Sequence, residues 1–242
     1  MPSSKSAGAE LERLTALPFA HRGLHGGGRV ENSRAAFEAA VAAGHGIELD
    51  VQASRDGEAF VFHDDELDRL TGERGSLIGY STRELGEITL SGCEEPIPTL
   101  ADVLALVRGR VPVLVEVKIP GRRVARLCLA VFRALEGYRG PVAVMSFNPE
   151  VPSWFARHAP RRLRGLVVTE SGKKGLRGRA ERHLAFWRSR AQFLAYDIRD
   201  LPARFAARQR KAGLPVLTWT VRSEEERERA ALHADQIIYE EE

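Results

Sequence analysis

The sequence is poor in cysteine, with only Cys93 and Cys128 among its 242 residues. This pair gives neither the closely spaced thiolates of a metal motif nor the even-numbered set of a disulfide framework. We therefore expect two free thiols in a reducing compartment, and the class of small folds held together by disulfides is excluded.

Long apolar runs are also missing from the sequence. No stretch approaches the roughly 18 consecutive apolar residues that a membrane-spanning helix needs. Residues 1–23 contain no apolar core of the kind found in a secretory signal peptide. From these absences we expect a cytoplasmic protein with no stable membrane insertion.

A strong charge of one sign is absent as well. Lys and Arg number 36 and Asp and Glu 33, so the net charge is only +3. This small excess is compatible with an anionic small-molecule substrate, but it is too weak to indicate a nucleic-acid partner. The 43% hydrophobic and 29% charged residues are typical of a globular protein with a sizeable core.

Apolar runs typical of strands alternate with segments of helical periodicity along the chain. Parallel strands joined by helical crossovers give this order. We expect helices at residues 33–43, 99–108, 122–135, 149–159, 179–190, 202–212 and 223–232. The expected strands lie at residues 18–22, 46–53, 113–118, 142–146, 163–169, 193–197, 216–221 and 236–239.

Eight strands in this order favour a TIM (β/α)₈ barrel, for which a chain of about 250 residues is usual. A doubly wound open sheet is the alternative, because the spacing alone does not exclude it. We expect one domain over residues 18–242, preceded by an N-terminal segment, 1–17. Within that segment, residues 10–17 are a candidate for a short helix that covers the base of the barrel.

An insertion is expected after the second strand. A turn signal at residues 55–58 and a short strand at 59–62 predict a hairpin-like piece. Residues 64–97, which are rich in Gly and Pro, then predict a long irregular excursion. Long loops of this kind in compact domains are usually functional.

Polar side chains gather at the carboxyl ends of the expected strands, which is the face where TIM barrels carry their active sites. Glu48 and Asp50 stand two residues apart on one strand and so point the same way, and Glu116 and Lys118 repeat this spacing on the next. Three buried carboxylates repel one another unless a positive charge is present. A hard divalent cation with oxygen ligands is one solution, and ion pairing with Lys118 is the other.

Two histidines flank these carboxylates, His21 at the end of the first strand and His63 at the end of the short strand. Histidine exchanges protons near neutral pH, so the pair can serve as base and acid around one phosphate. A hydrogen-bonded structural role is the alternative for each ring. Arg22 and Lys118 supply positive charge nearby, suited to phosphate oxygens or to the carboxylates themselves.

Several short motifs follow one another in a specific order. They are His21-Arg22-Gly23, Glu31-Asn32-Ser33, residues 47–51, Phe62-His63-Asp64, residues 67–72 and 97–100, Glu116-Val117-Lys118, Ser146-Phe147-Asn148 and residues 218–221. This ordered set, which spans about residues 18–240, resembles the glycerophosphodiester phosphodiesterase family. The sequence departs from the family pattern at Val30, where Pro is usual, at Ser33, where Thr is usual, and after Tyr239, where an Asp-Pro continuation is absent.

The resemblance implies a TIM barrel with a small insertion after the second strand. It implies hydrolysis of a small-molecule glycerophosphodiester to glycerol 3-phosphate and an alcohol, with a divalent cation, Mg²⁺ or Ca²⁺, as cofactor. The implied cation ligands are Glu48, Asp50 and Glu116. The implied base and acid are His21 and His63, the phosphate is held by Arg22 and Lys118, and we expect Phe147, Trp219 and the insertion to shape the side of the leaving alcohol.

Two alternatives stay open. One is a related phosphodiesterase or lyase of the same superfamily, similar to sphingomyelinase D or to phosphatidylinositol phospholipase; the missing secretory signal and disulfide pair weigh against a secreted toxin-like enzyme. The other is a non-catalytic barrel that binds phosphate. The complete set of candidate residues weighs against that possibility.

Overall fold

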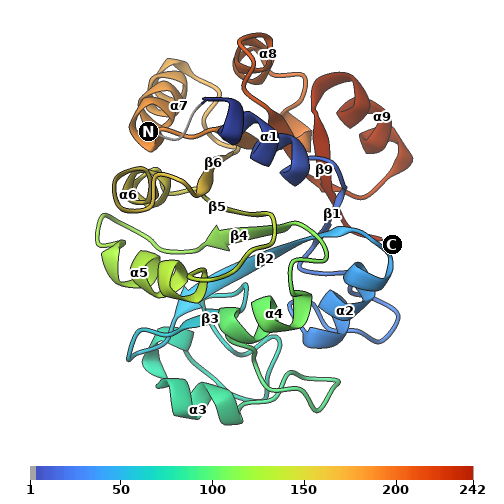
Figure 1. The fold of residues 1–242 in the computed structure, drawn as a ribbon, viewed down its shortest axis with the longest axis vertical. Helices are drawn as coiled ribbons and strands as arrows, with labels where there is room; N and C mark the ends of the chain where they lie inside the picture. The colour runs from blue at the N-terminus through green and yellow to red at the C-terminus, as the bar shows by residue number, and fades with distance from the viewer. Residues whose placement is uncertain (1–3, 242) are drawn as a thin grey trace.

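The eight parallel strands found in the described part of the chain close into a barrel (Figure 1). The computed structural model describes residues 4–241, with side chains from residue 8 onward. The first strand pairs with both the second and the last, so no open edge remains. The TIM barrel is confirmed, and the doubly wound open sheet is wrong. The strands are β1 (Phe19–His21), β2 (Gly46–Ala53), β4 (Val113–Val117), β5 (Val142–Ser146), β6 (Leu163–Val168), β7 (Phe193–Asp197), β8 (Val216–Val221) and β9 (Gln236–Tyr239).

Helices surround the barrel and connect its strands (Figure 1). Ser33 and Thr99 begin the first two crossover helices, because each side-chain oxygen accepts a hydrogen bond from a backbone N–H three residues later. Among the described residues, no helix is both long and apolar enough to cross a bilayer. The crossover helices are α2 (Arg34–Ala42), α4 (Leu100–Val107), α5 (Ala125–Ala134), α6 (Glu150–His158), α7 (Leu176–Ser189), α8 (Arg204–Lys211) and α9 (Glu224–His233).

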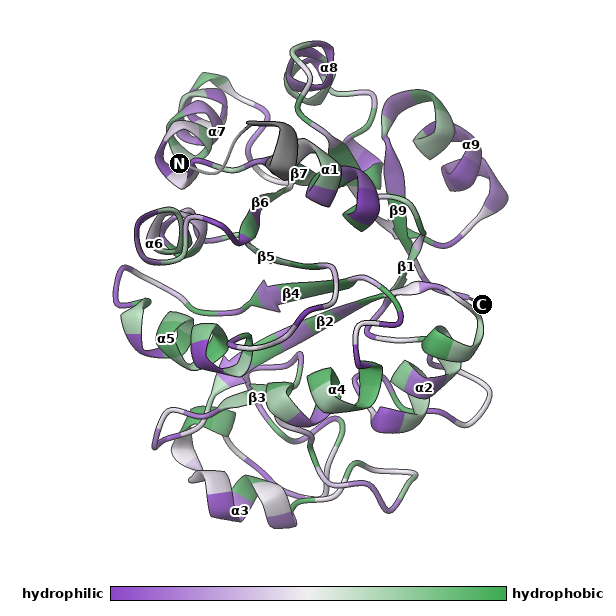
Figure 2. Ribbon diagram, viewed as in Figure 1, coloured by the Kyte–Doolittle hydropathy of each residue, from purple (hydrophilic) through white to green (hydrophobic). Residues whose placement is uncertain are grey.

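The core has two layers. One lies between the strands and the surrounding helices, and α4 is the most uniformly hydrophobic of these helices (Figure 2). The other fills the barrel lumen with inward-facing side chains such as Phe19, Leu114 and Phe193. Gly165 makes room there, because a Cβ at this position would lie 2.3 Å from the Phe193 ring.

Helix α1 (Ser4–Leu14) covers the base of the barrel. Leu14 is fully buried in the same cluster as the lumen side chains. The expected helix is therefore present, but it occupies residues 4–14 and not 10–17. The side chain of Thr15 bonds back to the Leu11 carbonyl, and Pro18 follows shortly before the first strand.

The insertion after β2 is partly ordered into regular structure, which corrects the expectation of an irregular excursion. The strand β3 (Ala59–Val61), which lies just before the insertion, pairs antiparallel with β2. The insertion then contains a 3₁₀ turn, η1 (Leu77–Gly79), and a short helix, α3 (Thr82–Glu87). Ser81 and Glu84 form a reciprocal capping box that starts this helix. A separate apolar cluster holds the segment together: Phe60, Phe62, Leu67, Leu77, Leu85, Leu90 and Ile97.

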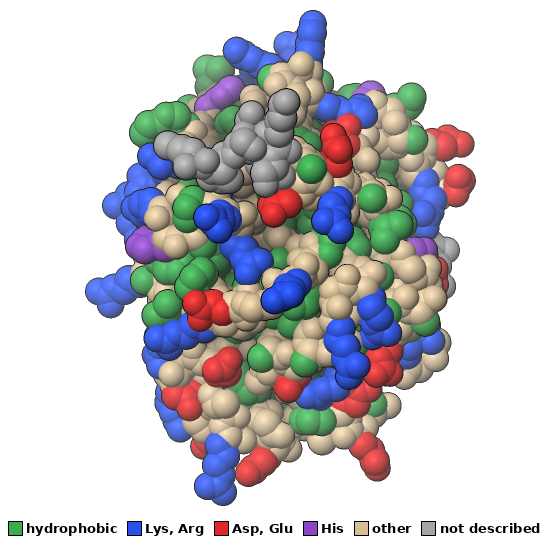
Figure 3. All heavy atoms as spheres, in the orientation of Figure 1, with side chains coloured by type: hydrophobic (Ala, Val, Ile, Leu, Met, Phe, Trp, Pro, Cys, Tyr) green, Lys and Arg blue, Asp and Glu red, His purple; other side chains and the backbone are tan. Residues whose placement is uncertain are grey.

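The molecular surface seen in Figure 3 carries both signs of charge. Acidic and basic side chains are interspersed over most of this face, whereas Lys and Arg gather along its left edge, over α6 and α7. The small net charge of the chain thus conceals an uneven distribution.

Candidate active site

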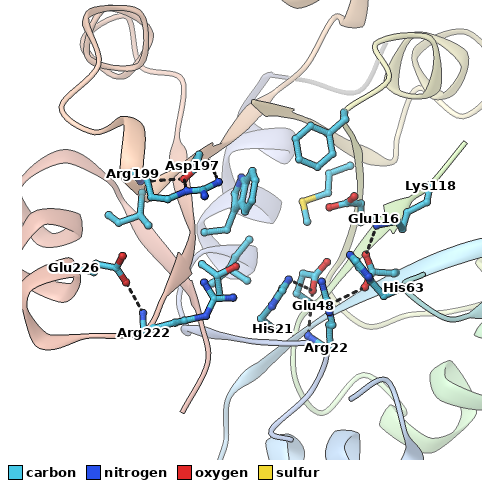
Figure 4. Close-up of a pocket in the computed structure, with 17 residues that line it drawn as sticks. His21, Arg22, Glu48, His63, Glu116, Lys118, Asp197, Arg199, Arg222 and Glu226 are labelled. Atoms are coloured by element: carbon cyan, nitrogen blue, oxygen red, sulfur yellow. Dashed lines mark hydrogen bonds and ion pairs between the residues drawn. The ribbon is translucent and has the colours of Figure 1, made fainter. Parts of the chain in front are cut away.

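A cavity of about 280 Å³ lies at the carboxyl ends of the barrel strands (Figure 4). Its walls contain residues from β1, β2, β4, β5, β8 and β9 and from the segments that follow β3 and β7. The nine candidate residues all line it: His21, Arg22, Glu48, Asp50, His63, Glu116, Lys118, Phe147 and Trp219. The structure thus brings together side chains spread over some two hundred positions of the sequence.

The three carboxylates form a buried cluster at the bottom of this cavity. One oxygen from each of Glu48, Asp50 and Glu116 lies within 4.8 Å of the others. The parallel register of β2 and β4 causes this, because it sets Asp50 beside Glu116. Burial, followed by the charges of its neighbours, raises the pKa of Glu48 well above its usual range and that of Glu116 to about 8.

Ion pairing offsets only part of this negative charge. Asp50 has Arg22 Nε at 3.3 Å and Lys118 Nζ at 3.6 Å. Among the described residues, no Lys, Arg or His nitrogen lies within 4.0 Å of a Glu116 oxygen. The alternative of pure salt bridging therefore accounts for Asp50 but leaves Glu116 without a direct partner.

The residues of the cluster fit a hard divalent cation. They offer carboxylate oxygens, the ligands that Mg²⁺ and Ca²⁺ prefer. Asn32, which is buried, donates its Nδ2 to Asp50 Oδ2 at 3.2 Å. Its own Oδ1 is buried and has no hydrogen-bond partner within residues 4–241. A cation in this place could bind the Asn32 Oδ1 as a ligand, and its charge would stabilise the ionised forms of Glu48 and Glu116.

His21 is held by a carboxylate that sequence reasoning missed. Its Nδ1 lies 2.5 Å from Oε1 of Glu240, which follows β9. Partial burial would raise the pKa of Glu240, but hydrogen bonds from His21 and Arg222 outweigh this and lower it to about 2. The ionised Glu240 therefore accepts the Nδ1 proton. Burial lowers the pKa of His21, so its Nε2, 3.8 Å from Glu48, carries a free lone pair.

His63 has a comparable partner on the other side of the cavity. Its Nδ1 lies 2.6 Å from Asp64 Oδ1, and Arg69 donates to the same carboxylate at 2.6 and 3.0 Å. Hydrogen bonds from Arg69, opposed by burial, lower the pKa of Asp64 to about 2. Arg69 also donates twice to Glu31, which accepts from Arg22 at 2.8 Å.

This chain of contacts shows what the insertion does. Arg69 belongs to the insertion and links the His63–Asp64 pair to the Glu31–Arg22 pair. Within the described part of the chain, no residue of 64–97 lines the cavity. The insertion therefore contacts the site through Arg69, and its expected part in shaping the side of the leaving alcohol stays a prediction.

The backbone at Arg22 is in the left-handed region, with φ of 57°. This unusual conformation for a non-glycine residue lets the Arg22 N–H donate to Glu48 Oε2 at 3.2 Å. Gly23 follows with φ of 80°, and a Cβ there would lie 2.9 Å from Ala36. Gly23 is thus required for the turn that directs the His21 and Arg22 side chains into the cavity.

The opposite wall combines aromatic and charged side chains. Phe147 and Trp219 meet edge to face, with ring centroids 5.4 Å apart, and the Trp219 indole donates to the Ala195 carbonyl. Figure 4 shows Arg199 across the cavity from His21 and Glu48, whereas the Arg222 side chain extends toward His21 and donates to Glu240 at 2.6 Å. Sequence reasoning missed these two arginines, although Arg222 directly follows β8 and Arg199 lies two residues after β7, and that position was a usable signal.

Comparison with known proteins decides the family. The model of the glycerophosphoryl diester phosphodiesterase family matches residues 21–240. The chain belongs to this family. It is 41% identical to a glycerophosphodiester phosphodiesterase of Bacillus altitudinis over 42% of this chain and 44% of that protein. It is 36% identical to one of Caldanaerobacter subterraneus over 44% of this chain and 46% of that protein. Each match thus spans less than half of the relative.

Solved structures support the fold over nearly the whole chain. An Oleispira antarctica phosphodiesterase, in complex with the product sn-glycerol-3-phosphate, superposes with a TM-score of 0.79 at 24% identity and covers 93% of both chains. A glycerophosphodiester phosphodiesterase of Thermotoga maritima gives a TM-score of 0.74, also at 24% identity, over 92% of this chain and 94% of the other. At 24% identity these two structures support the barrel fold of this chain and nothing finer.

Proposed function

We propose that this chain hydrolyses glycerophosphodiesters to sn-glycerol 3-phosphate and an alcohol. The observation that carries the proposal is one cavity with two carboxylate-oriented histidines on either side of a buried acidic cluster. Membership of the family and the product complex of the Oleispira antarctica relative support this choice of substrate.

His21 is the proposed general base. Its Nδ1–H is directed to Glu240, which leaves Nε2 to accept a proton from the attacking hydroxyl. Burial lowers the pKa of His21, which favours the neutral ring that a base requires. The ring is fixed by two elements from opposite ends of the chain, β1 and the segment after β9.

His63 is the proposed general acid, with both ring nitrogens protonated at the start of the reaction. Asp64 accepts from Nδ1–H, and Nε2–H gives its proton to the oxygen of the departing alcohol. Arg22 and Lys118 are the proposed phosphate ligands. Arg22 Nε lies 3.3 Å from Asp50 but makes no hydrogen bond among the described residues, so its N–H is proposed as a donor to a phosphate oxygen.

Glu48, Asp50 and Glu116 are the proposed ligands of a divalent cation, Mg²⁺ or Ca²⁺. When bound, such a cation would offset the charge of these carboxylates and of the phosphate and would polarise a bound hydroxyl. The raised pKa of Glu116, about 8, supports the need for this extra positive charge.

The attacking hydroxyl is proposed to be that of glycerol C2. It is tethered to the reacting phosphate, and a well-oriented intramolecular attack can gain about 7–11 kcal/mol over a bimolecular one. Its oxygen bonds to phosphorus as its proton passes to His21, and the bond to the alcohol oxygen breaks as His63 protonates it. Water then opens the cyclic phosphate, which returns both histidines to their starting forms.

Release of glycerol 3-phosphate from glycerophosphocholine by the purified protein tests the proposal. We expect turnover that EDTA abolishes and that added Mg²⁺ or Ca²⁺ restores. A panel with other head groups identifies the preferred alcohol. A protein that binds glycerol 3-phosphate but releases none from any diester, with or without cations, is a binding barrel and not a hydrolase.

The superfamily lyase is separated from the hydrolase by its end product. A lyase of the phosphatidylinositol phospholipase type leaves a cyclic phosphate, whereas the proposed hydrolase leaves glycerol 3-phosphate. Phosphorus NMR of the completed reaction distinguishes the two. Persistent cyclic phosphate would show that the second step, attack by water, does not occur in this cavity.

A further inference from the structure

Helix α7 turns an apolar stripe away from the barrel. Leu176, Leu184 and Trp187 are 82%, 57% and 76% exposed, and exposed Ala180 lies between them. Their spacing of four, four and three residues puts all four on one side of the helix. The opposite side, which includes Gly178, is buried. The stripe therefore adds nothing to the core, and the outward face of a surface helix is ordinarily polar.

Positive side chains border this stripe on both sides. Residues 171–190 contain seven Lys or Arg and a single acidic residue, Glu181. At about 100° per residue, Arg177 and Arg188 lie along one border and Arg179 lies along the other, and Arg190 follows directly after the helix ends. Figure 3 shows the resulting gathering of Lys and Arg at the left edge of the view, over α6 and α7.

Part of this positive charge has no direct counter-charge. Arg177 pairs with Glu181 and Arg188 with Glu150 of α6. Arg179 and Arg190, by contrast, make no ion pair with any described residue. The border on the α8 side is therefore the more strongly positive one.

A basic groove of about 510 Å³ continues this border between α7 and α8. Its lining includes six Lys or Arg side chains but only two acidic ones, Glu170 and Asp200. One of the six, Arg199, also lines the active-site cavity. On the other side of α7, Phe147 lines both the active-site cavity and a pocket beside Gly178. A pocket on each side of α7 thus shares one residue with the active-site cavity.

We propose that α7 and this basic groove dock on the surface of a bilayer that contains anionic lipids. Surface helices of this kind insert Leu and Trp at the level of the head groups, and the flanking Lys and Arg attract the negative surface. A second copy of the chain is a poorer occupant, because a two-fold interface would set the same arginine borders against each other. A nucleic acid would match the charge but would give the Leu and Trp stripe no apolar partner.

Docking in this way attaches the barrel to the bilayer surface by the outward side of α7. A peripheral attachment is compatible with the absence of a spanning helix among residues 4–241. The attachment does not depend on the proposed hydrolysis, because none of the stripe residues lines the active-site cavity.

Vesicle sedimentation of the whole protein tests this proposal. Vesicles of phosphatidylcholine alone are compared with vesicles in which one lipid in three is phosphatidylglycerol. We expect strong preference for the anionic vesicles. Replacing Arg179 and Arg190 together by Gln should weaken that binding about 30-fold, since each such cation near the surface contributes about fivefold. The double change of Leu184 and Trp187 to Ser should abolish binding.

Matched controls lie elsewhere on the surface. Leu232→Ser removes an apolar side chain on α9 that is 70% exposed, and Arg83→Gln removes a cation in the insertion that is 89% exposed. Both control variants should bind as the unchanged protein does. Thermal unfolding and hydrolysis of soluble glycerophosphocholine should be the same for all variants.

Three results would overturn the proposal. Equal binding to neutral and anionic vesicles is one, and equal binding by the α7 variants and the control variants is another. The third is a lipid-free protein that sediments as a dimer and becomes monomeric on Leu184→Ser, which would identify the stripe as a self-interface. Because the measurement is binding, a chain that hydrolyses no diester still gives a clear answer here.

Discussion

Replacing Glu240 by Gln removes the charge that orients His21 while keeping the size of the side chain. The pKa of Glu240 falls from 4.5 to about 2 through its contacts with His21 and Arg222. One pKa unit corresponds to about 1.4 kcal/mol, so these contacts together stabilise the ionised carboxylate by about 3 kcal/mol. If between half and all of this is lost in the transition state, kcat falls about 10- to 150-fold.

The assay follows glycerol 3-phosphate release from glycerophosphocholine and separates kcat from KM. The loss should appear in kcat, because Glu240 contacts His21, the proposed base, and does not line the cavity. Arg222→Gln is the matched control, since it removes the other partner of Glu240, at 2.6 Å, and leaves the contact with His21. Glu240→Asp, which keeps the charge, should recover part of the lost rate.

The same variant has a signature in folding stability. The pKa of Glu240 is depressed in the folded state, so its contribution to stability is present above pH 4.5 and is lost as the pH falls toward about 2. The free energy of unfolding should therefore differ between the two proteins at pH 6 and converge near pH 2. A Glu240→Gln enzyme within twofold of the unchanged rate, alongside an inactive His21→Ala enzyme, would refute the assigned role of Glu240.

Three further changes test the rest of the site. His63→Ala should lower turnover about 10²- to 10⁴-fold with unchanged thermal unfolding, and a near-normal rate would remove His63 as the acid. Glu116→Gln should weaken the affinity for Mg²⁺ or Ca²⁺, measured by calorimetry. Loss of a residue that only supports a metal ligand costs about 10- to 100-fold, and loss of the proposed ligand itself should cost more. Glu73→Gln, an exposed site, is its control. Trp219→Ala should raise KM about 2- to 10-fold from the lost aromatic contact; if the protein unfolds instead, Trp219 belongs to the core.

Local patterns in the sequence were sufficient for the strands and for the nine candidate residues. Each of the nine candidate residues lies on or just after an apolar run. Because the parallel strands of a barrel end at one face, the meeting of these residues in one cavity follows from the topology. Local sequence patterns do not, however, predict which side chains contact one another across the barrel. Glu240 is 219 positions from His21, and only closure of β9 against β1 brings them together.

Glycines misled the reading of two segments. The sequence pattern predicts the helix at α7 from residue 179, and the two nearby glycines, Gly175 and Gly178, give no sign of an earlier start. Gly178 is instead inside the helix, where a Cβ would lie 2.0 Å from the Lys173 carbonyl oxygen. The loop before the helix packs onto that position. In the insertion, several glycines concealed the Ser81–Glu84 capping box, although its spacing is visible in the sequence.

The acidic side chains of the site fall into two electrostatic classes that composition cannot distinguish. Glu31, Asp64 and Glu240 each accept hydrogen bonds from Arg or His, and each has its pKa lowered to about 2. Glu48 and Glu116 are buried beside other carboxylates, and their pKa values are raised. The first class fixes the two histidines and Arg22 in position. The second class lacks enough positive charge, and that deficit is the strongest physical argument that a cation completes the site.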